Sequence, residues 1–291
     1  LKITKKIKFF FNKFLPGIFS SGVTQINILV GTIIASFQAS AVSYLYYADR
    51  IYQINLAIAG IAIGTVLLPS LSKYVEQNDF QKIKFIQNKA LELSLFLCLP
   101  ATFALLISSE QITSALFGYG SFNYQSVKNS SDALYFFAIG LPAFALIKVF
   151  SSYIFARHNT QTPFIYSLYS VIINVCISLY FFPETGFIII PIATTISSWF
   201  YAAILFNFLI KKKYFIFDSV LNFSIFKIIF TSIITSYLFY NLIYYFEDFL
   251  VYESKYKLLT IILIVSITAV IYILISIFTK AFKISDIKLK Y

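Results

Sequence analysis

Residues 186–210 read GFIIIPIATTISSWFYAAILFNFLI and contain no Asp, Glu, Lys or Arg. A helix needs about 20 consecutive apolar residues to cross the hydrocarbon core of a bilayer, so this stretch is long enough to span one. Seven other stretches have the same character, and the eight predicted spans are approximately 16–38, 42–69, 89–109, 133–156, 163–183, 186–210, 223–246 and 257–279. The sequence therefore predicts an all-α polytopic membrane protein with eight transmembrane helices, because backbone polar groups in lipid must be satisfied within the structure.

The composition of the 291-residue chain supports a membrane location. Hydrophobic residues make up 59% and charged residues 12%, and the mean hydropathy is +0.81. A soluble domain usually carries about 25% charged residues, so this chain could not cover its surface in water. These values exclude an ordinary soluble protein, a disordered chain and a nucleic-acid-binding protein. The net charge of +11 does not alter that conclusion, since the basic residues stand in short clusters between the apolar stretches.

The distribution of Lys and Arg predicts the orientation of the spans. When the two sides of the membrane are assigned by alternation from the N-terminus, one side receives 18 basic residues and the other three. The larger group comprises Lys2, Lys5, Lys6, Lys8, Lys13, Lys73, Lys82, Lys84, Lys89, Arg157, Lys211, Lys212, Lys213, Lys227, Lys280, Lys283, Lys288 and Lys290. The smaller group comprises Lys128, Lys255 and Lys257. Because cytoplasmic segments are enriched in Lys and Arg, the sequence predicts that both termini lie in the cytoplasm.

Motifs for catalysis and for metal or cofactor binding are absent from the sequence. His158 is the only histidine, and no two carboxylates share a helix face inside a predicted span. No GxSxG, HExxH or Gly-rich phosphate loop occurs. The two cysteines, Cys98 and Cys176, lie in apolar stretches and form neither a disulfide framework nor a CxxC metal site. We therefore expect no enzymatic activity, no cofactor and no metal site.

The segment Tyr46-Tyr47-Ala48-Asp49-Arg50 places a guanidinium eight or nine residues inside a predicted span. At a rise of 1.5 Å per residue, Arg50 would lie about 12 Å below the outer end of that helix. A charged Arg at this depth costs about 2.5–3.5 kcal/mol in lipid, so we expect it to face an aqueous cavity or a partner. One interpretation is a cavity arginine for an anionic substrate, since guanidinium binds phosphate in a bidentate manner. The other is a structural ion pair with another helix, because Asp49 points about 100° away on an ideal helix.

Further polar residues lie within the predicted spans. Lys148 stands about eight residues from the cytoplasmic end of its span and can extend its ammonium to the interface, which is the explanation we favour. Asn174 and Ser178 share a helix face because they are four positions apart. With polar residues of other spans they could line a polar pocket, although interhelical hydrogen bonds are the simpler explanation. The candidate pocket residues are Gln25, Asn27, Asn174, Ser178 and Thr194.

Three motifs of this chain resemble those of the MurJ/MviN family of lipid II flippases, and they occur in the same order. The first is Tyr46–Arg50 followed by Gly60-Ile-Ala-Ile-Gly-Thr-Val-Leu-Leu-Pro-Ser-Leu-Ser72. The second, Leu116–Phe122, is similar to an external loop motif of the family. The third, Lys148–Pro163, resembles the family's Lys–Tyr–Ala–Arg–x–Asp–Thr–x–Thr–Pro stretch. The chain departs from the family pattern at Asn159, where Asp is usual, and at Ser121, where a basic residue is common.

The resemblance implies a particular domain organisation. Members of the family have two six-helix lobes followed by two extra helices, and this chain looks like the second lobe with the extra pair. We expect a cytoplasmic basic segment at 1–15, a six-helix lobe at 16–212, and two additional helices with a cytoplasmic C-terminus at 213–291. The absence of Met from the chain agrees with a missing first lobe.

The resemblance also implies a substrate, a mechanism and a location. The substrate is lipid II, an undecaprenyl-pyrophosphate-linked disaccharide-pentapeptide, which two lobes move across the bacterial inner membrane by alternating access around a cationic cavity. Arg50 matches the family's cavity arginine on this lobe, and the final two spans resemble the pair that forms a groove for the lipid tail. The candidate substrate-binding residues are Tyr47, Asp49, Arg50, Gln53 and Lys148. The expected partners are lipid II, membrane lipids and the absent N-terminal six-helix lobe, without nucleic acid.

Two alternatives to a lipid II flippase remain at this point. The first is another oligosaccharide-lipid or O-antigen exporter of the same superfamily, against which the motifs at 46–50 and 60–72 argue. The second is a non-transporting membrane remnant of a split gene. A neighbouring reading frame that encodes six matching spans would separate this remnant from a working half-transporter.

Overall fold

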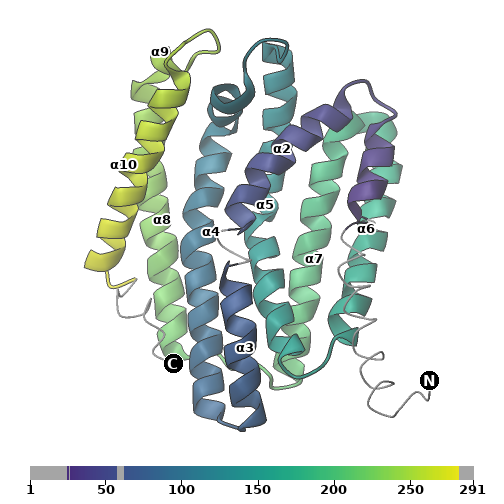
Figure 1. Ribbon diagram of the computed structural model, residues 1–291, viewed down its shortest axis with the longest axis vertical. Coiled ribbons are helices and arrows are strands. Elements are labelled where there is room, and N and C mark those ends of the chain that lie inside the picture. Colours follow the sequence, from purple (N-terminus) through teal and green to yellow (C-terminus); the bar gives the residue numbers. More distant parts are fainter. Residues whose placement is uncertain (1–24, 26, 58–61, 282–291) are drawn as a thin grey trace, which may run out of the picture. The chain divides into compact units, whose positions relative to one another are not determined.

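The computed structural model describes residues 25, 27–57 and 62–281, and every regular element in these parts is helical. After a helical stretch at 27–35, the chain forms the elements labelled in Figure 1. These elements are α2 (Ala41–Leu56), α3 (Ala62–Glu76), α4 (Phe80–Phe117), α5 (Tyr124–Phe155), α6 (Gln161–Thr185), η2 (Gly186–Ile188), α7 (Ile189–Lys211), α8 (Ser219–Tyr245), α9 (Glu247–Leu250) and α10 (Lys257–Phe278). The predicted all-helical class is confirmed.

Helices α4, α5, α6, α7, α8 and α10 coincide with the last six predicted spans. Five helical stretches of the described chain are long and apolar enough to cross a membrane, and one of these, Gln161–Lys211, contains both α6 and α7. The chain is thus a multi-pass membrane protein, but the count of eight spans is not established. The basic segment 1–15 and residues 16–24 and 26 of the first predicted span, 16–38, lie outside the described residues.

The predicted span 42–69 differs most from the structure. The described residues form two helices there, α2 of 16 residues and α3 of 15 residues, with 58–61 outside the description. Each is shorter than the roughly 20 residues that a straight crossing requires. Helix α3 also runs beyond the predicted boundary to Glu76, with Pro69 inside it. The sequence analysis counted the apolar residues of both helices as one span, and a single span that continues through 58–61 stays a prediction.

Helix α4 is longer than its predicted span. Its 38 residues correspond to about 57 Å of helical rise, summed over both sides of a kink at Ser108, which exceeds the ~30 Å of a hydrocarbon core. Asp79 caps its start, where the backbone N–H of Lys82 donates to Asp79 Oδ1 over 3.1 Å and lowers the pKa of this carboxyl group. Near its other end the backbone departs from helical geometry at Ser108, with φ −134° and ψ 32°. The first turns of α4 are polar, so the search for apolar stretches did not include them.

The described chain separates into two compact units, each of which draws on several parts of the sequence. One unit contains α3, the first part of α4, the last part of α5, α6 and α7. The other contains most of α2, the remaining parts of α4 and α5, and α8, α9 and α10. We call them unit 1 and unit 2. The division along the chain at residue 212 stays a prediction.

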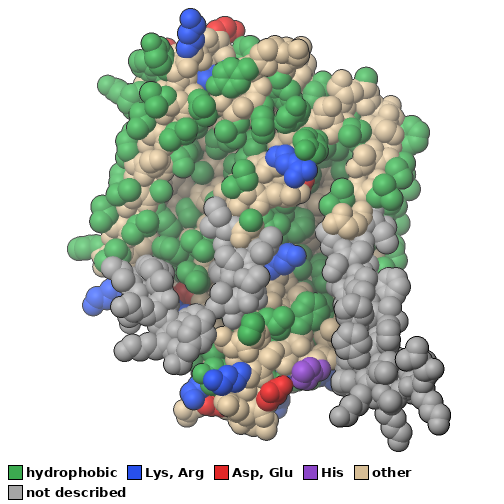
Figure 2. Space-filling view, in the orientation of Figure 1, with side chains coloured by type: hydrophobic (Ala, Val, Ile, Leu, Met, Phe, Trp, Pro, Cys, Tyr) green, Lys and Arg blue, Asp and Glu red, His purple; other side chains and the backbone are tan. Residues whose placement is uncertain are grey.

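Large apolar side chains form the interior of unit 2 and much of the molecular surface. Inside unit 2, α4 packs against α8 and α10 through a buried cluster that includes Ala115, Phe239 and Ile264. Many other large hydrophobic side chains are exposed, among them Phe226 and Leu274. Figure 2 shows such side chains over much of the visible face, with few charged groups between them. An exposed apolar surface of this extent is stable against lipid but not against water.

Candidate functional site

Arg50 lies on α2 with an exposed side chain, although apolar residues occupy much of the helix. Its guanidinium stands over the ring of Tyr46, with 4.5 Å between the guanidinium carbon and the ring centroid. A cation–π contact of this kind leaves the edge of the guanidinium available for a bidentate contact with an oxyanion. A cavity role for Arg50 stays a prediction.

Asp49 has a different partner. Its carboxylate accepts a hydrogen bond from the amide of Gln53, one turn further along α2. Within the described parts of the chain, no ion pair joins Asp49 to Arg50. The alternative explanation for Arg50 was an ion pair with another helix, and within the described residues Arg50 forms no ion pair. Asp49 and Gln53 form a polar pair beside Arg50 on the same helix.

Tyr47 connects α2 to the loop between α4 and α5. Its ring centroid lies 4.8 Å from that of Phe117 and 4.7 Å from that of Phe122. All three rings belong to unit 2. Tyr47 is half-buried in this aromatic cluster, so its ring fixes the position of α2 against the loop. A direct contact with substrate stays a prediction for this residue.

The remaining candidate cation, Lys148, lies on the part of α5 that belongs to unit 1, whereas Arg50 belongs to unit 2. Its side chain is exposed, as the extension of an ammonium toward the interface requires. Its backbone carbonyl accepts a hydrogen bond from the hydroxyl of Ser152 over 2.8 Å. A substrate role for Lys148 stays a prediction.

Three of the five polar-pocket candidates form a hydrogen-bonded network between α6 and α7. The side-chain amide of Asn174 donates to Thr194 Oγ1 over 2.9 Å and to Ser197 Oγ over 3.4 Å. The hydroxyl of Ser178 donates to Asn174 Oδ1 over 3.2 Å. Asn174 and Ser178 are buried. The sequence analysis did not include Ser197, whose position one helical turn from Thr194 could have indicated it.

The other two pocket candidates, Gln25 and Asn27, lie at the start of the described chain. Gln25 is exposed, and Asn27 is half-buried at the first residue of the helical stretch 27–35. Gln38, just after this stretch, accepts a hydrogen bond from the backbone N–H of Phe187 over 2.7 Å. That bond attaches the stretch to the connection between α6 and α7, within unit 1.

An apolar cavity of about 480 Å³ lies within unit 2. Helix α4 contributes residues such as Leu97, Ala101 and Leu105, and α10 contributes a row that includes Ile261 and Val265. Residues from α2 and α8 complete its lining. Its walls carry mostly hydrocarbon with a few hydroxyl groups, so the cavity suits an alkyl chain better than a charged group.

Two cations have structural roles that the sequence analysis did not identify. Lys257, at the start of α10, is 1% exposed and donates hydrogen bonds to the carbonyl oxygens of Gly118 and Tyr252 over 2.7 and 2.6 Å. Arg157, between α5 and α6, donates to the carbonyl oxygens of Tyr153 and Tyr214 over 2.6 and 2.9 Å. Burial lowers the pKa of the Arg157 guanidinium, and the neighbouring Tyr214 partly opposes that effect.

Sequence comparison relates the chain to lipid II flippases. A family model described as lipid II flippase MurJ matches residues 2–260. A probable lipid II flippase MurJ of Rhizobium meliloti (strain 1021) is 41% identical over 211 residues, which cover 72% of this chain and 39% of that protein. The corresponding protein of Rickettsia prowazekii (strain Madrid E) is 39% identical over 197 residues, which cover 68% of this chain and 39% of that protein. The chain thus spans about two fifths of the length of these curated relatives.

Comparison with solved structures also relates the chain to lipid II flippases. A solved structure of lipid II flippase MurJ in an inward closed conformation matches with a TM-score of 0.74 at 27% identity, covering 96% of this chain and 57% of that one. An outward-facing multidrug resistance transporter of the MATE family matches with a TM-score of 0.57 at 14% identity, covering 80% of this chain and 53% of that one. At this low identity, the match shows a shared fold alone. The family model and the related sequences together establish that the chain belongs to the MurJ family of lipid II flippases.

Proposed function

We propose that this chain forms the second lobe and the extra helix pair of a lipid II flippase in the bacterial inner membrane. The observation that carries the proposal is the match of residues 2–260 to the lipid II flippase family model. In this proposal the chain works with an N-terminal six-helix lobe, and the two lobes alternate access to a central cavity. Such a transporter binds its substrate between repeats, so one lobe provides only one wall of the site.

Arg50 is the proposed contact for the pyrophosphate of lipid II. Its charge is exposed on α2, and Tyr46 supports the face of its guanidinium. An exposed Arg on a membrane helix is costly in lipid, by about 2.5–3.5 kcal/mol, and that cost is reduced if the side chain faces a wet cavity. Asp49 and Gln53 form a polar surface beside it. These features support a cavity wall at α2 that attracts an anion.

The apolar cavity of unit 2 is the proposed site for part of the polyprenyl tail. Its volume of about 480 Å³ and its lining from α4, α8 and α10 favour a hydrocarbon occupant. Helices α8 and α10 belong to the segment 213–291, which we propose as the additional helix pair beside the lobe at 16–212. Both chain termini are proposed to be cytoplasmic, from the 18-to-three division of basic residues.

Translocation by reconstituted protein tests the proposal. The chain is co-expressed with the N-terminal lobe of a related flippase, reconstituted in vesicles, and assayed for accessibility of lipid II at the opposite leaflet. We expect translocation with both halves and none with the chain alone. An undecaprenyl-pyrophosphate-linked O-antigen unit serves as a control substrate. Transport of that lipid in preference to lipid II would overturn the proposed substrate, and efficient transport by the chain alone would overturn the need for a second lobe.

A further inference from the structure

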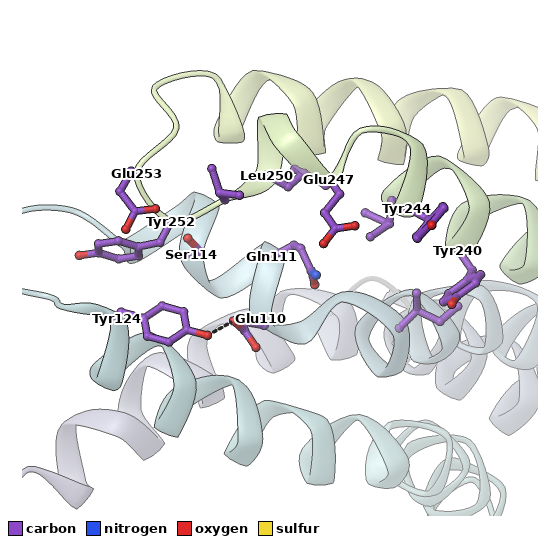
Figure 3. Close-up of a pocket in the computed structure, with 13 residues that line it drawn as sticks. Glu110, Gln111, Ser114, Tyr124, Tyr240, Tyr244, Glu247, Leu250, Tyr252 and Glu253 are labelled. Carbon is purple, nitrogen blue, oxygen red and sulfur yellow. Dashed lines mark hydrogen bonds between the residues drawn. The ribbon is translucent and has the colours of Figure 1, made fainter.

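A second cavity, of about 620 Å³, lies within unit 2 at the end where α8 leads through α9 into α10. Figure 3 shows its lining, which includes the carboxylates of Glu110, Glu247 and Glu253. Four tyrosines also line it, namely Tyr124, Tyr240, Tyr244 and Tyr252. This volume falls within the range of small-molecule sites, about 300–1,000 Å³. The cavity does not include Arg50, and it is separate from the proposed contact with pyrophosphate.

The charges of this cavity favour a cationic occupant. Glu110 accepts a hydrogen bond from Tyr124 over 2.9 Å, shown in Figure 3, and its other oxygen lies 3.6 Å from the ammonium of Lys128. Within the described chain, no ion pair is formed by Glu247 or Glu253. Neither carboxylate is in an ion pair within this part of the chain, although Glu253 interacts electrostatically with the ammonium of Lys257, and both repel phosphate or carboxylate ligands. In Figure 3 the carboxylate of Glu247 points from α9 toward the cavity.

A buried hydroxyl provides an independent indication of a ligand. Ser114 lines the cavity and is only 4% exposed. Its hydroxyl has no hydrogen-bond partner among the described residues. Most buried side-chain polar groups have a partner, so a hydroxyl without one at the wall of a cavity marks a position where a ligand can donate or accept. Ser114 lies on the same face of α4 as Glu110 and one turn away from it.

The same region of unit 2 already binds an ammonium group with tyrosine rings. The Lys257 ammonium lies 4.5 Å from the ring centroids of both Tyr119 and Tyr252. Tyr252 also lines the cavity, where the exposed rings of Tyr240 and Tyr244 offer further aromatic faces. Tyrosine faces attract ammonium groups through their quadrupole. Carboxylates, tyrosine rings and a buried hydroxyl together form the chemistry that recognises a primary ammonium.

From these observations we infer that the cavity is a binding site for small organic amines with a primary ammonium group. The ammonium pairs with Glu247 and Glu253, the carbon chain lies against the tyrosine rings, and a hydrogen bond reaches Ser114. A divalent metal is less favoured, because no group of three His, Cys, Asp or Glu side chains suited to a metal occurs in the described residues. The inference does not depend on the proposed transport of lipid II.

Calorimetric titration of the purified chain in an uncharged detergent tests the inference. The probe is 1,5-diaminopentane, and pentane-1,5-diol of the same length is its neutral control. We expect saturable binding of the diamine only. Glu247→Gln and Glu253→Gln should each weaken it at least tenfold, and Ser114→Ala about threefold. Asp248→Asn is the matched control, since Asp248 neighbours Glu247 on α9 but does not line the cavity; it should change affinity less than twofold.

A second measurement needs no variant. Esterification of the carboxyl groups of the unmodified chain with a diazo compound does not couple them to amines. Read by mass spectrometry, it should show that the diamine protects Glu247 and Glu253 but not Asp248. Nα-acetyl-lysine amide distinguishes the source of the amine: tighter binding than the diamine indicates the basic side chain of a peptide, and weaker binding indicates a free diamine. The inference is wrong if the diol binds as well as the diamine, if Asp248→Asn has the same effect as Glu247→Gln, or if labelling shows no selective protection.

Discussion

The hydroxyl of Tyr272 on α10 donates a hydrogen bond to the backbone carbonyl of Phe96 on α4 over 2.8 Å. That carbonyl lies four residues before Pro100, which has no N–H with which to continue the helix ladder. Tyr272 therefore supplies the donor that the proline lacks. The two rings of Tyr272 and Phe96 also stack, with their centroids 4.9 Å apart. The proline thus creates an attachment point for α10 on α4.

Removal of this donor should destabilise the chain. Tyr272→Phe leaves a buried carbonyl without a partner, which costs about 1–3 kcal/mol. In a Pro100→Ala background the new N–H can bond to the Phe96 carbonyl, so the same Tyr272→Phe change should cost much less. A double-mutant cycle, measured by thermal unfolding in detergent, should give a positive coupling energy between the two positions. Equal costs of Tyr272→Phe in both backgrounds would contradict this account of Pro100.

Lys257 should be a second attachment point of α10. Its ammonium binds two carbonyl oxygens and two tyrosine faces in a nearly fully buried position. Lys257→Ala leaves the carbonyls of Gly118 and Tyr252 without this donor, so we expect a loss of about 2–4 kcal/mol in unfolding free energy. Lys255→Ala is the control, since Lys255 is exposed two residues earlier. Similar melting temperatures for the two variants would show that Lys257 contributes little.

Helices α5, α6, α7, α8 and α10 could be predicted from the sequence because each contains an apolar stretch of sufficient length, whatever its neighbours are. Arg50 could be found for a related reason, since a charged residue inside an otherwise apolar segment is visible without any tertiary information. The role of Lys257 could not be found in this way. Its partner Gly118 is 139 residues away, and the sequence analysis counted this lysine only as a charge on one side of the membrane.

Arg157 holds the linker between α7 and α8, and its loss should release that linker. Its guanidinium contacts the Tyr214 ring at 4.4 Å as well as the Tyr214 carbonyl. Arg157→Ala should therefore speed tryptic cleavage after Lys211, Lys212 and Lys213 by severalfold and cost about 1.5–3 kcal/mol of stability. Arg157→Lys should restore only part of the protection, because it lacks the planar fork. Unchanged cleavage in Arg157→Ala would exclude this role.

The network of Asn174 illustrates what periodicity can and cannot predict. The i, i+4 spacing placed Asn174 and Ser178 on one helix face, and the structure joins them by a hydrogen bond. The spacing could not show which helix faces that surface. Contacts with Thr194 and Ser197 supply that information, and they depend on how α6 and α7 pack against each other.

We expect no tight sodium site at this network. Its members offer amide and hydroxyl oxygens but no carboxylate, whereas hard cations prefer charged oxygen ligands. Asn174→Ala should lower the melting temperature by the same amount in sodium and in potassium buffers, because it removes hydrogen bonds between α6 and α7. A sodium-dependent increase in the melting temperature of the unmodified chain that is lost in Asn174→Ala would refute this expectation.

Variants of Arg50 give the sharpest test of the proposed function. If Arg50 binds the pyrophosphate, both its charge and its fork matter. In a transporter completed with an N-terminal lobe, Arg50→Ala and Arg50→Glu should reduce complementation of a flippase-depleted strain below about a tenth, since loss of a charged hydrogen bond of about 1.5–3 kcal/mol weakens binding at least tenfold. Arg50→Lys should restore little or part of the activity. Lys212→Ala, which changes an exposed cation outside the candidate site, is the control.

The competing explanation is that Arg50 has a structural role together with Asp49. Removal of both members of a buried charge pair is often tolerated, so Asp49→Asn combined with Arg50→Gln should then restore growth. We expect no restoration, because the partner of Asp49 is Gln53 and the guanidinium of Arg50 lies over Tyr46. Protein abundance in the membrane is measured for every variant. Growth of the double variant, or full activity of Arg50→Ala at normal abundance, would contradict the substrate role; failure of Arg50→Ala, Arg50→Glu and the double variant at normal abundance would support it.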